Sequence, residues 1–233
     1  GWDHETSAAQ WVPGAPAWAP LPDMAARRCG AAAVALLDGR TLVTGGGSAG
    51  GGQEKVEVLA ADGSGWSALT PMATARLSHA AAVLPCGKVL VPGGFGGVNE
   101  LSDGRALKAA ELWDPATGAW SDLPPMAQER AGAGCCVLPS GRVAVVGGFV
   151  DYQGRRDGEM FDPEARTWQP LPPMAHDRSS QGVVAVAGGL LAVGGSNVAG
   201  TIAVPAELFD EASGRWFELP HPMAEPRMAL SLH

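Results

Sequence analysis

Arginine recurs at one place in a repeated phrase, and a cation at a fixed place is the first candidate for chemistry in this sequence. The five copies, each four residues after a methionine, are Arg28, Arg76, Arg130, Arg178 and Arg227. Such cations either form a ring that binds acidic ligands or pair once per repeat with a recurring glutamate. Because a partly buried charge without a partner is unfavourable, we expect ion pairs at most of these positions.

The other reactive side chains show no arrangement typical of catalysis or of a metal site. The five histidines lack the spacing of zinc ligands, and the four cysteines include no C-x-x-C pair. No nucleophile elbow, H-E-x-x-H or P-loop motif is present, and the glycine-rich run at 45–52 lacks the lysine and the helix of a phosphate loop. The sequence therefore predicts no catalytic residue, no metal and no cofactor.

Charge and hydropathy disfavour two classes of partner. The 233 residues include 16 basic and 24 acidic ones, and the basic residues are scattered, so no positive stripe is available for phosphates. No apolar run reaches the roughly 18 residues that a membrane span requires. We expect neither nucleic acid nor a membrane as partner. Since buried thiols are the ordinary interpretation of these cysteines, we expect a cytoplasmic location.

A phrase opened by tryptophan repeats along the chain with a period near 50. Successive copies are 48, 54, 48 and 48 residues apart, and a typical phrase is W-S-D-L-P-P-M. The tryptophans are Trp18, Trp66, Trp120, Trp168 and Trp216. We expect the Trp, Pro and Met side chains of the phrase to pack between repeats.

Each period predicts four short antiparallel strands. The arginine is followed by an aliphatic segment, a tight turn with glycine, and a second aliphatic segment that ends in a diglycine. The third strand contains a recurring glutamate, and the fourth begins at the tryptophan. The diglycines are Gly45-Gly46, Gly93-Gly94, Gly147-Gly148 and Gly194-Gly195, and the glutamates are Glu57, Glu111, Glu159 and Glu207.

This order of features resembles the kelch superfamily, whose repeats form the blades of β-propellers. Diglycine, Glu, Trp and Arg keep their order in four copies, from about Trp18 to His233. The resemblance implies an all-β kelch-type β-propeller with four full four-stranded blades, at about 28–71, 76–125, 130–173 and 178–220. Residues 1–17 are expected to form an irregular N-terminal segment, and residues 18–233 the propeller.

Partial blade strands are expected at each end, from a fourth strand at Trp18 and a fifth blade begun at 227. Each blade buries one face against its neighbour, and propellers commonly close with four to eight blades. We therefore expect a fragment of a larger propeller, with a four-bladed ring carrying loose ends as the alternative.

The candidate binding surface is the face that carries the long loops. In an antiparallel four-stranded blade, the loop between the second and third strands emerges on the same face as the link to the next blade. These loops vary in length and chemistry, which is typical of a recognition surface on a repeated scaffold. The candidate binding residues are Phe95, Asn99, Glu100, Arg105, Phe149, Tyr152, Arg155, Arg156 and Asn197.

The kelch resemblance adds three residues and a ligand type. In kelch propellers that bind acidic peptides, some arginines at the repeated position contact the ligand, so Arg76, Arg130 and Arg178 are added at the rim. We expect a protein or peptide partner of acidic or mixed charge on this face.

Three functions remain open. The resemblance favours a non-catalytic protein-protein interaction module, such as the substrate-recognition propeller of a ubiquitin-ligase adaptor or another scaffold. The alternative is part of a galactose oxidase-like or sugar-processing enzyme. The galactose oxidase copper site needs two tyrosines, whereas this chain has one, Tyr152. A purely structural module is the third hypothesis.

Overall fold

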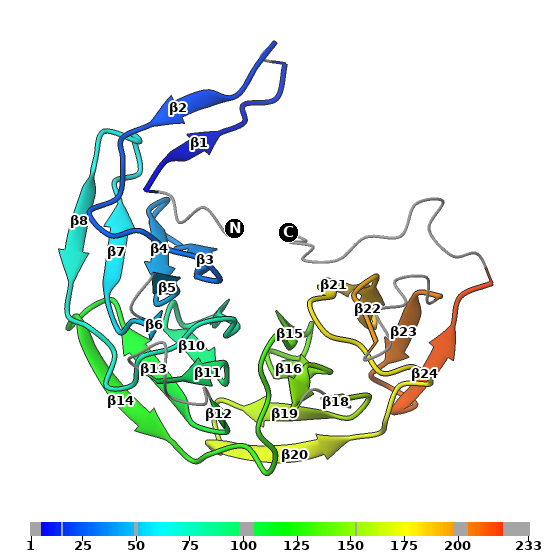
Figure 1. The fold of residues 1–233 in the computed structure, drawn as a ribbon. Helices are drawn as coiled ribbons and strands as arrows, with labels where there is room; N and C mark the ends of the chain where they lie inside the picture. Colours follow the sequence, from blue (N-terminus) through cyan, green and yellow to red (C-terminus); the bar gives the residue numbers. More distant parts are fainter. Residues whose placement is uncertain are drawn as a thin grey trace.

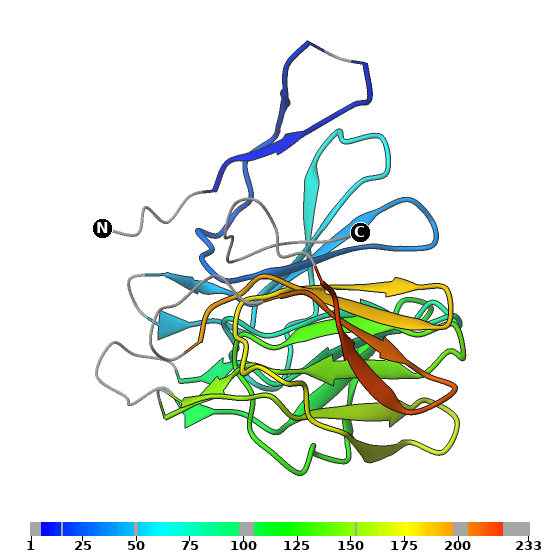
Figure 2. The same cartoon turned by 90° about the vertical axis from the view of Figure 1, so that its right-hand side faces the viewer.

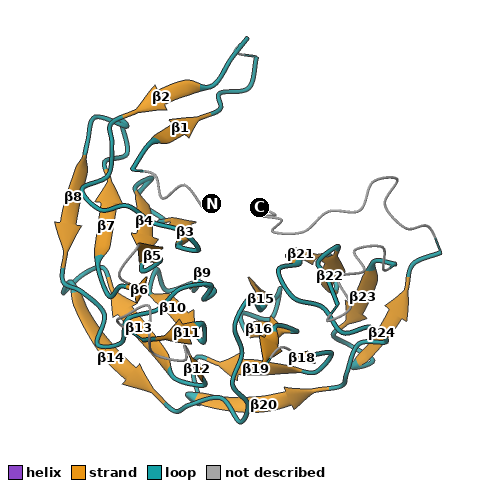
Figure 3. Ribbon diagram, viewed as in Figure 1, coloured by secondary structure: helices purple, strands orange, loops and turns teal. Residues whose placement is uncertain are grey.

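Four four-stranded antiparallel sheets follow one another around an open arc (Figure 1). The computed structural model describes residues 6–14, 16–48, 51–97, 105–151, 153–197 and 205–220. These residues form strands and turns and contain no helix (Figure 3), hence none long and apolar enough to cross a membrane. The all-β propeller blades predicted from the repeat are confirmed.

Each sheet is one blade, and its strands run from the inside of the arc to the outside in chain order. Blade 1 consists of β3 (Ala32–Ala35), β4 (Thr41–Thr44), β7 (Val56–Leu59) and β8 (Trp66–Leu69). Blade 2 consists of β9 (Ala82–Val83), β10 (Val89–Pro92), β13 (Ala110–Asp114) and β14 (Ala119–Leu123). Blade 3 consists of β15 (Gly134–Val137), β16 (Val143–Val146), β19 (Gly158–Asp162) and β20 (Thr167–Leu171). Blade 4 consists of β21 (Gly182–Val186), β22 (Gly189–Val193), β23 (Glu207–Asp210) and β24 (Arg215–Glu218).

Tight turns and long loops emerge on opposite faces of the arc. In the side view of Figure 2 the tight turns point to the right and the long loops to the left. Three of the long loops contain small hairpins of their own. Their strands are β5 (Gly47–Ser48) with β6 (Gly51–Gly52), β11 (Phe95–Gly96) with β12 (Arg105–Ala106), and β17 (Phe149–Val150) with β18 (Gln153–Gly154).

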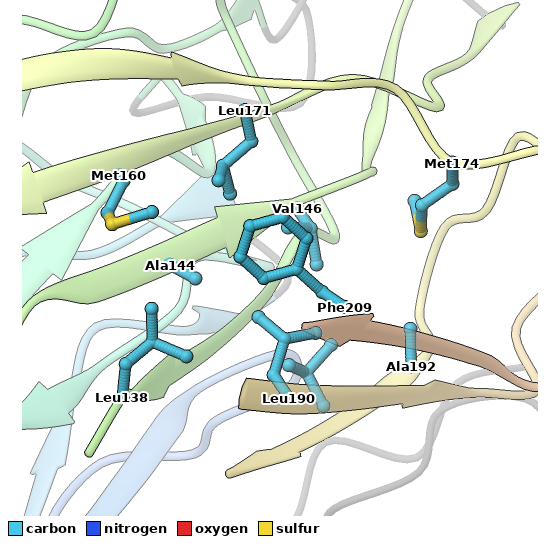
Figure 4. Close-up of a cluster of buried hydrophobic side chains, with 10 residues drawn as sticks. Leu138, Ala144, Val146, Met160, Leu171, Met174, Leu190, Ala192 and Phe209 are labelled. Carbon is cyan, nitrogen blue, oxygen red and sulfur yellow. The ribbon is translucent and has the colours of Figure 1, made fainter. Parts of the chain in front are cut away.

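Blades pack face to face through apolar side chains. Between blades 3 and 4, Val146 and Met160 of blade 3 lie in one cluster with Leu190 and Phe209 of blade 4 (Figure 4). Met174, from the repeated phrase, joins this cluster and is 1% exposed. Burying one such side chain contributes about 1.5–3 kcal/mol, so the interface between blades is the main source of cohesion.

The N-terminal part departs from the sequence expectation. β1 (Ala8–Gln10) pairs with β2 (Ala19–Leu21), in the register that β13 and β14 have in blade 2. The rings of Trp11 and Trp18 lie 6.1 Å apart, close to the 6.5 Å that separates the corresponding rings in blade 2. The expectation that residues 1–17 are irregular is therefore wrong for β1, which takes the position relative to β2 that the third strand of a full blade takes relative to the fourth.

Candidate functional site

The repeated arginine is buried and bonded within its own blade. In blade 2 the guanidinium of Arg76 donates to the carbonyl oxygens of Gly93 and Ala109, at 2.8 and 2.9 Å. It also donates to Oε1 of Glu111 at 2.9 Å. The corresponding pairs are Arg28–Glu57, Arg130–Glu159 and Arg178–Glu207. All four arginine side chains are at most 1% exposed, which confirms the predicted ion pairs.

This geometry corrects one part of the candidate site. Arg76, Arg130 and Arg178 do not present their charges at the rim, because each guanidinium lies inside its blade and is engaged by carbonyl oxygens and a carboxylate. Turning one outward would leave a buried carboxylate unpaired, which is strongly unfavourable. These residues hold the link between blades in place.

The glutamate of each pair also binds the backbone of that link. In blade 1 the carboxylate of Glu57 accepts hydrogen bonds from the N–H groups of Ala25 and Ala26, at 2.8 and 3.3 Å. Burial alone would raise the pKa of Glu57, but the hydrogen bonds from Arg28 and from these backbone groups lower it below its usual value. The repeat predicts the pairing of these charges, but it carries no signal for the backbone contacts.

Loops from blades 2 and 3 join into one surface on the long-loop face. The rings of Phe95 and Phe149 meet edge to face, with centroids 5.0 Å apart, and both side chains are half-buried. Strand β12 lies against β17 beside them. The ring of Phe149 also lies close to Gly132, where an added Cβ would come within 3.1 Å of it. Two predicted site residues from different repeats are thus in contact.

Only part of the predicted positive charge on this face is free. Arg105 and Arg156 are exposed, and their guanidinium groups have no partner among the described residues. Arg155 instead donates from Nε and Nη2 to the carboxylate of Asp157, at 2.9 and 2.8 Å. Burial alone would raise the pKa of Asp157, but hydrogen bonds from Arg155 and then from Arg130 hold it below its usual range. The adjacent pair at 155–156 therefore presents one free cation.

Three predicted site residues, Asn99, Glu100 and Tyr152, lie outside the described residues. Asn197 is half-buried and follows Ser196, which forms a β-bridge with Ser179. Among the residues with described positions, no group of three or more His, Cys, Asp or Glu side chains has a geometry that could hold a metal ion.

The first strands of all four blades line a hollow of about 650 Å³ on the inside of the arc. His79 borders this hollow, and its Nε2 lies 2.8 Å from Oγ1 of Thr44 in blade 1. Burial, and then the charge of Arg76, lower the pKa of His79 to about 3, so the ring is neutral. Gln181 takes the same position in blade 4 and donates to the carbonyl oxygen of Val146 at 2.7 Å. Both side chains bridge neighbouring blades.

Comparison with known protein families identifies a sequence motif in two of the blades. The family model of the kelch motif matches residues 76–127 and 129–175, which correspond to blades 2 and 3. These two segments of the chain are kelch motifs. Blades 1 and 4 lie outside the two matched segments, but they share the Arg–Glu pair, the diglycine and the tryptophan of these kelch repeats. No curated protein matches the chain. Kelch propellers commonly bind proteins.

Proposed function

We propose that this kelch-repeat protein is a non-catalytic interaction module that binds a protein or peptide on its long-loop face. The observation that carries the proposal is the contact between Phe95 and Phe149, which joins the loops of two blades into one surface. Arg105 and Arg156 add exposed positive charge there, which favours an acidic or mixed-charge ligand despite the net charge of −8. Exposed charge pairs contribute only about 0–1 kcal/mol each, so contact with the two rings is needed for affinity.

We further propose that the module recognises substrates for a scaffold, such as a ubiquitin-ligase adaptor, in the cytoplasm. All four cysteines are free thiols, which supports a reducing compartment. The scattered cations and the acidic net charge favour a protein partner over nucleic acid. The apolar runs of the sequence are too short to favour a membrane partner. The galactose oxidase-like enzyme stays an alternative hypothesis.

The test compares two double variants with the same change in charge. Arg105→Glu/Arg156→Glu reverses the charge of the long-loop face, whereas Arg40→Glu/Lys88→Glu does so beside the tight turns of the opposite face, where both side chains pair within their own blades. Partners are captured from lysate with the wild-type chain and identified, and their affinities for all three chains are then measured by calorimetry. We expect the long-loop variant to weaken binding at least tenfold and the control to bind like the wild type.

Equal affinities of the two double variants would contradict the proposal, and loss of binding with the control alone would place the ligand on the opposite face. Arg142 is unsuitable as a control, although it lies at a tight turn. Its Nη2 donates to Oε1 of Glu211 in blade 4 at 2.6 Å, so its removal also disturbs the contact between blades.

A further inference from the structure

A hollow of about 380 Å³ crosses the outer side of the boundary between blades 3 and 4. Arg156, from the long loop of blade 3, lines it together with Arg215, which opens β24 in blade 4. Between them lie Pro172, Pro173 and Trp216. This volume is within the range of peptide-sized and small-molecule sites.

The two arginines are the unpaired cations of this hollow. Both are exposed, and neither guanidinium has a partner among the described residues. Of the two carboxylates in the lining, that of Glu207 is buried and bound to Arg178 at 2.8 Å, whereas that of Glu218 is half exposed and lies 3.0 Å from Nε2 of His176. Two unpaired cations therefore stand against one exposed carboxylate, which leaves the hollow with a net positive charge.

This pair of arginines is absent from the equivalent places at the other described boundaries between full blades. Between blades 1 and 2 the two positions are held by Glu54 and Ala119, and between blades 2 and 3 by Lys108 and Thr167. A side chain required by the blade scaffold recurs with the repeat, as the buried arginines do. The pair of cations at this boundary does not recur, so it is not required by the blade scaffold and is available for binding.

The floor of the hollow is apolar and fixed. Nε1 of Trp216 donates to the carbonyl oxygen of Pro172 at 2.8 Å, so the polar atom of the indole is already used. The ring also packs against Phe209, with centroids 5.2 Å apart. A pre-ordered aromatic surface binds apolar side chains with little loss of conformational entropy.

We propose that this hollow binds a linear acidic segment of a partner protein, with carboxylates at Arg156 and Arg215 and an apolar side chain against Trp216. The inference rests on the proposed function and deepens it, because it gives the acidic partner a second site and extends the binding surface from the long-loop face to the outer side of blade 4. Charge complementarity selects the acidic segment, and the aromatic floor selects a segment that also contains an apolar residue.

The test titrates the ¹⁵N-labelled chain with two blocked hexapeptides, the acidic GEEFEG and the neutral GQQFQG, and follows indole N–H signals by NMR. The variant Trp216→Phe assigns the signal of Trp216 by its loss. We expect the acidic peptide to shift this signal at millimolar concentration and the neutral peptide to leave it unchanged. Arg215→Gln should weaken binding roughly fivefold, which corresponds to about 1 kcal/mol for one exposed charge pair. Arg166→Gln, at the equivalent turn of blade 3, should have no effect.

Equal shifts with both peptides, no shift of the Trp216 signal, or unchanged affinity in Arg215→Gln would overturn the inference. Arg105→Glu separates it from the proposed function, because this residue lies in the loop hairpin and outside the hollow. If partner binding depends on Arg105 while the acidic peptide fails to bind, the interaction module stands and the acidic subsite is wrong. If the peptide binds and Arg105→Glu leaves partner binding intact, the subsite stands and the loop surface is wrong.

Discussion

Individual buried charges hold each blade to the link that enters it. One carboxylate, such as that of Glu57, accepts hydrogen bonds from a guanidinium and from two backbone N–H groups. The arginine satisfies in turn the carbonyl oxygens at the diglycine and at the start of the third strand. A buried pair of this kind is no guarantee of net stability, but removing one partner leaves an uncompensated charge.

The variant Arg76→Met tests this role. It keeps an apolar side chain of similar length but leaves the carboxylate of Glu111, which is 2% exposed, without its cation. We expect the free energy of unfolding to fall by about 3–5 kcal/mol in urea titrations. Arg40→Met, at an exposed turn where the side chain pairs only with Asp38, should change it by less than about 0.5 kcal/mol. A similar small change at both positions would show that the buried pair is dispensable.

His79 predicts a specific pH dependence of stability. Its pKa is lowered from 6.5 to about 3, so the unfolded chain takes up a proton below pH 6.5 while the folded chain stays neutral. The contribution of the neutral His79 ring to the free energy of unfolding is therefore fully present above pH 6.5, and it falls as the pH drops towards 3. We expect His79→Gln, which introduces the side chain that Gln181 supplies at the same position of blade 4, to remove this loss. Between pH 7.5 and 5 the wild type should lose on the order of 2 kcal/mol more than the variant, measured by urea unfolding. Parallel pH profiles would refute the assignment.

At the scale of the blade, the diglycine brings neighbouring blades into contact. Gly147 and Gly148 adopt φ of 66° and 94°, and the N–H of Gly148 donates to the carbonyl oxygen of Arg178 at 2.7 Å. The equivalent hydrogen bonds run from the N–H of Gly46 to the carbonyl oxygen of Arg76, and from the N–H of Gly94 to that of Arg130. They join blade 1 to blade 2 and blade 2 to blade 3. A side chain is excluded at the first glycine both by the left-handed backbone and by the close approach of the next link.

Alanine at two glycines of similar φ separates these two effects. In Gly147→Ala the new Cβ would lie 2.5 Å from the backbone oxygen of Arg178, whereas at Gly118, with φ of 69°, no atom lies within 4 Å. We expect Gly118→Ala to lower the free energy of unfolding by about 1–2 kcal/mol, the cost of the left-handed conformation. Gly147→Ala should cost at least about 2 kcal/mol more, measured by denaturant titration, because the backbone of the next link has to move. Equal losses would mean that close approach plays no part.

For the molecule as a whole, the arc leaves large apolar side chains exposed near both of its ends. Trp11 and Trp18 beside blade 1 are 48% and 66% exposed, and Phe217 on blade 4 is 47% exposed. Equivalent tryptophans within the arc, such as Trp168, are half-buried against the neighbouring blade. Exposed apolar patches and unpaired sheet faces favour association.

We therefore expect this chain to self-associate at micromolar concentration. Sedimentation velocity should show a sedimentation coefficient that rises with protein concentration. The double variant Trp18→Gln/Phe217→Gln should lower that dependence, because it removes apolar area at both ends of the arc. A monomer over the whole concentration range, for the wild type as well as the variant, would argue against association through these surfaces.

Much of the fold could be predicted because its determinants repeat. The turn glycines, the diglycines, the glutamates and the tryptophans each act within one blade or between one blade and the next, so their spacing reports the strands directly. The same logic predicted the Arg–Glu pairs. The same signal is present at the N-terminus, where Trp11 precedes Trp18 by seven residues, as Trp113 precedes Trp120. This spacing matches β1 to the third strand of a full blade.

Only the tertiary structure decided which side chains remain available for binding. Residues in variable loops do not recur, so no spacing reveals that Phe95 meets Phe149, or that Arg155 is neutralised by Asp157 while Arg156 is free. The burial of the repeated arginines likewise depends on carbonyl groups from segments about 17–33 residues away. The sequence by itself determined the blades, because their contacts are periodic. The binding surface depends on contacts that occur once, and those are settled only when the blades are packed together.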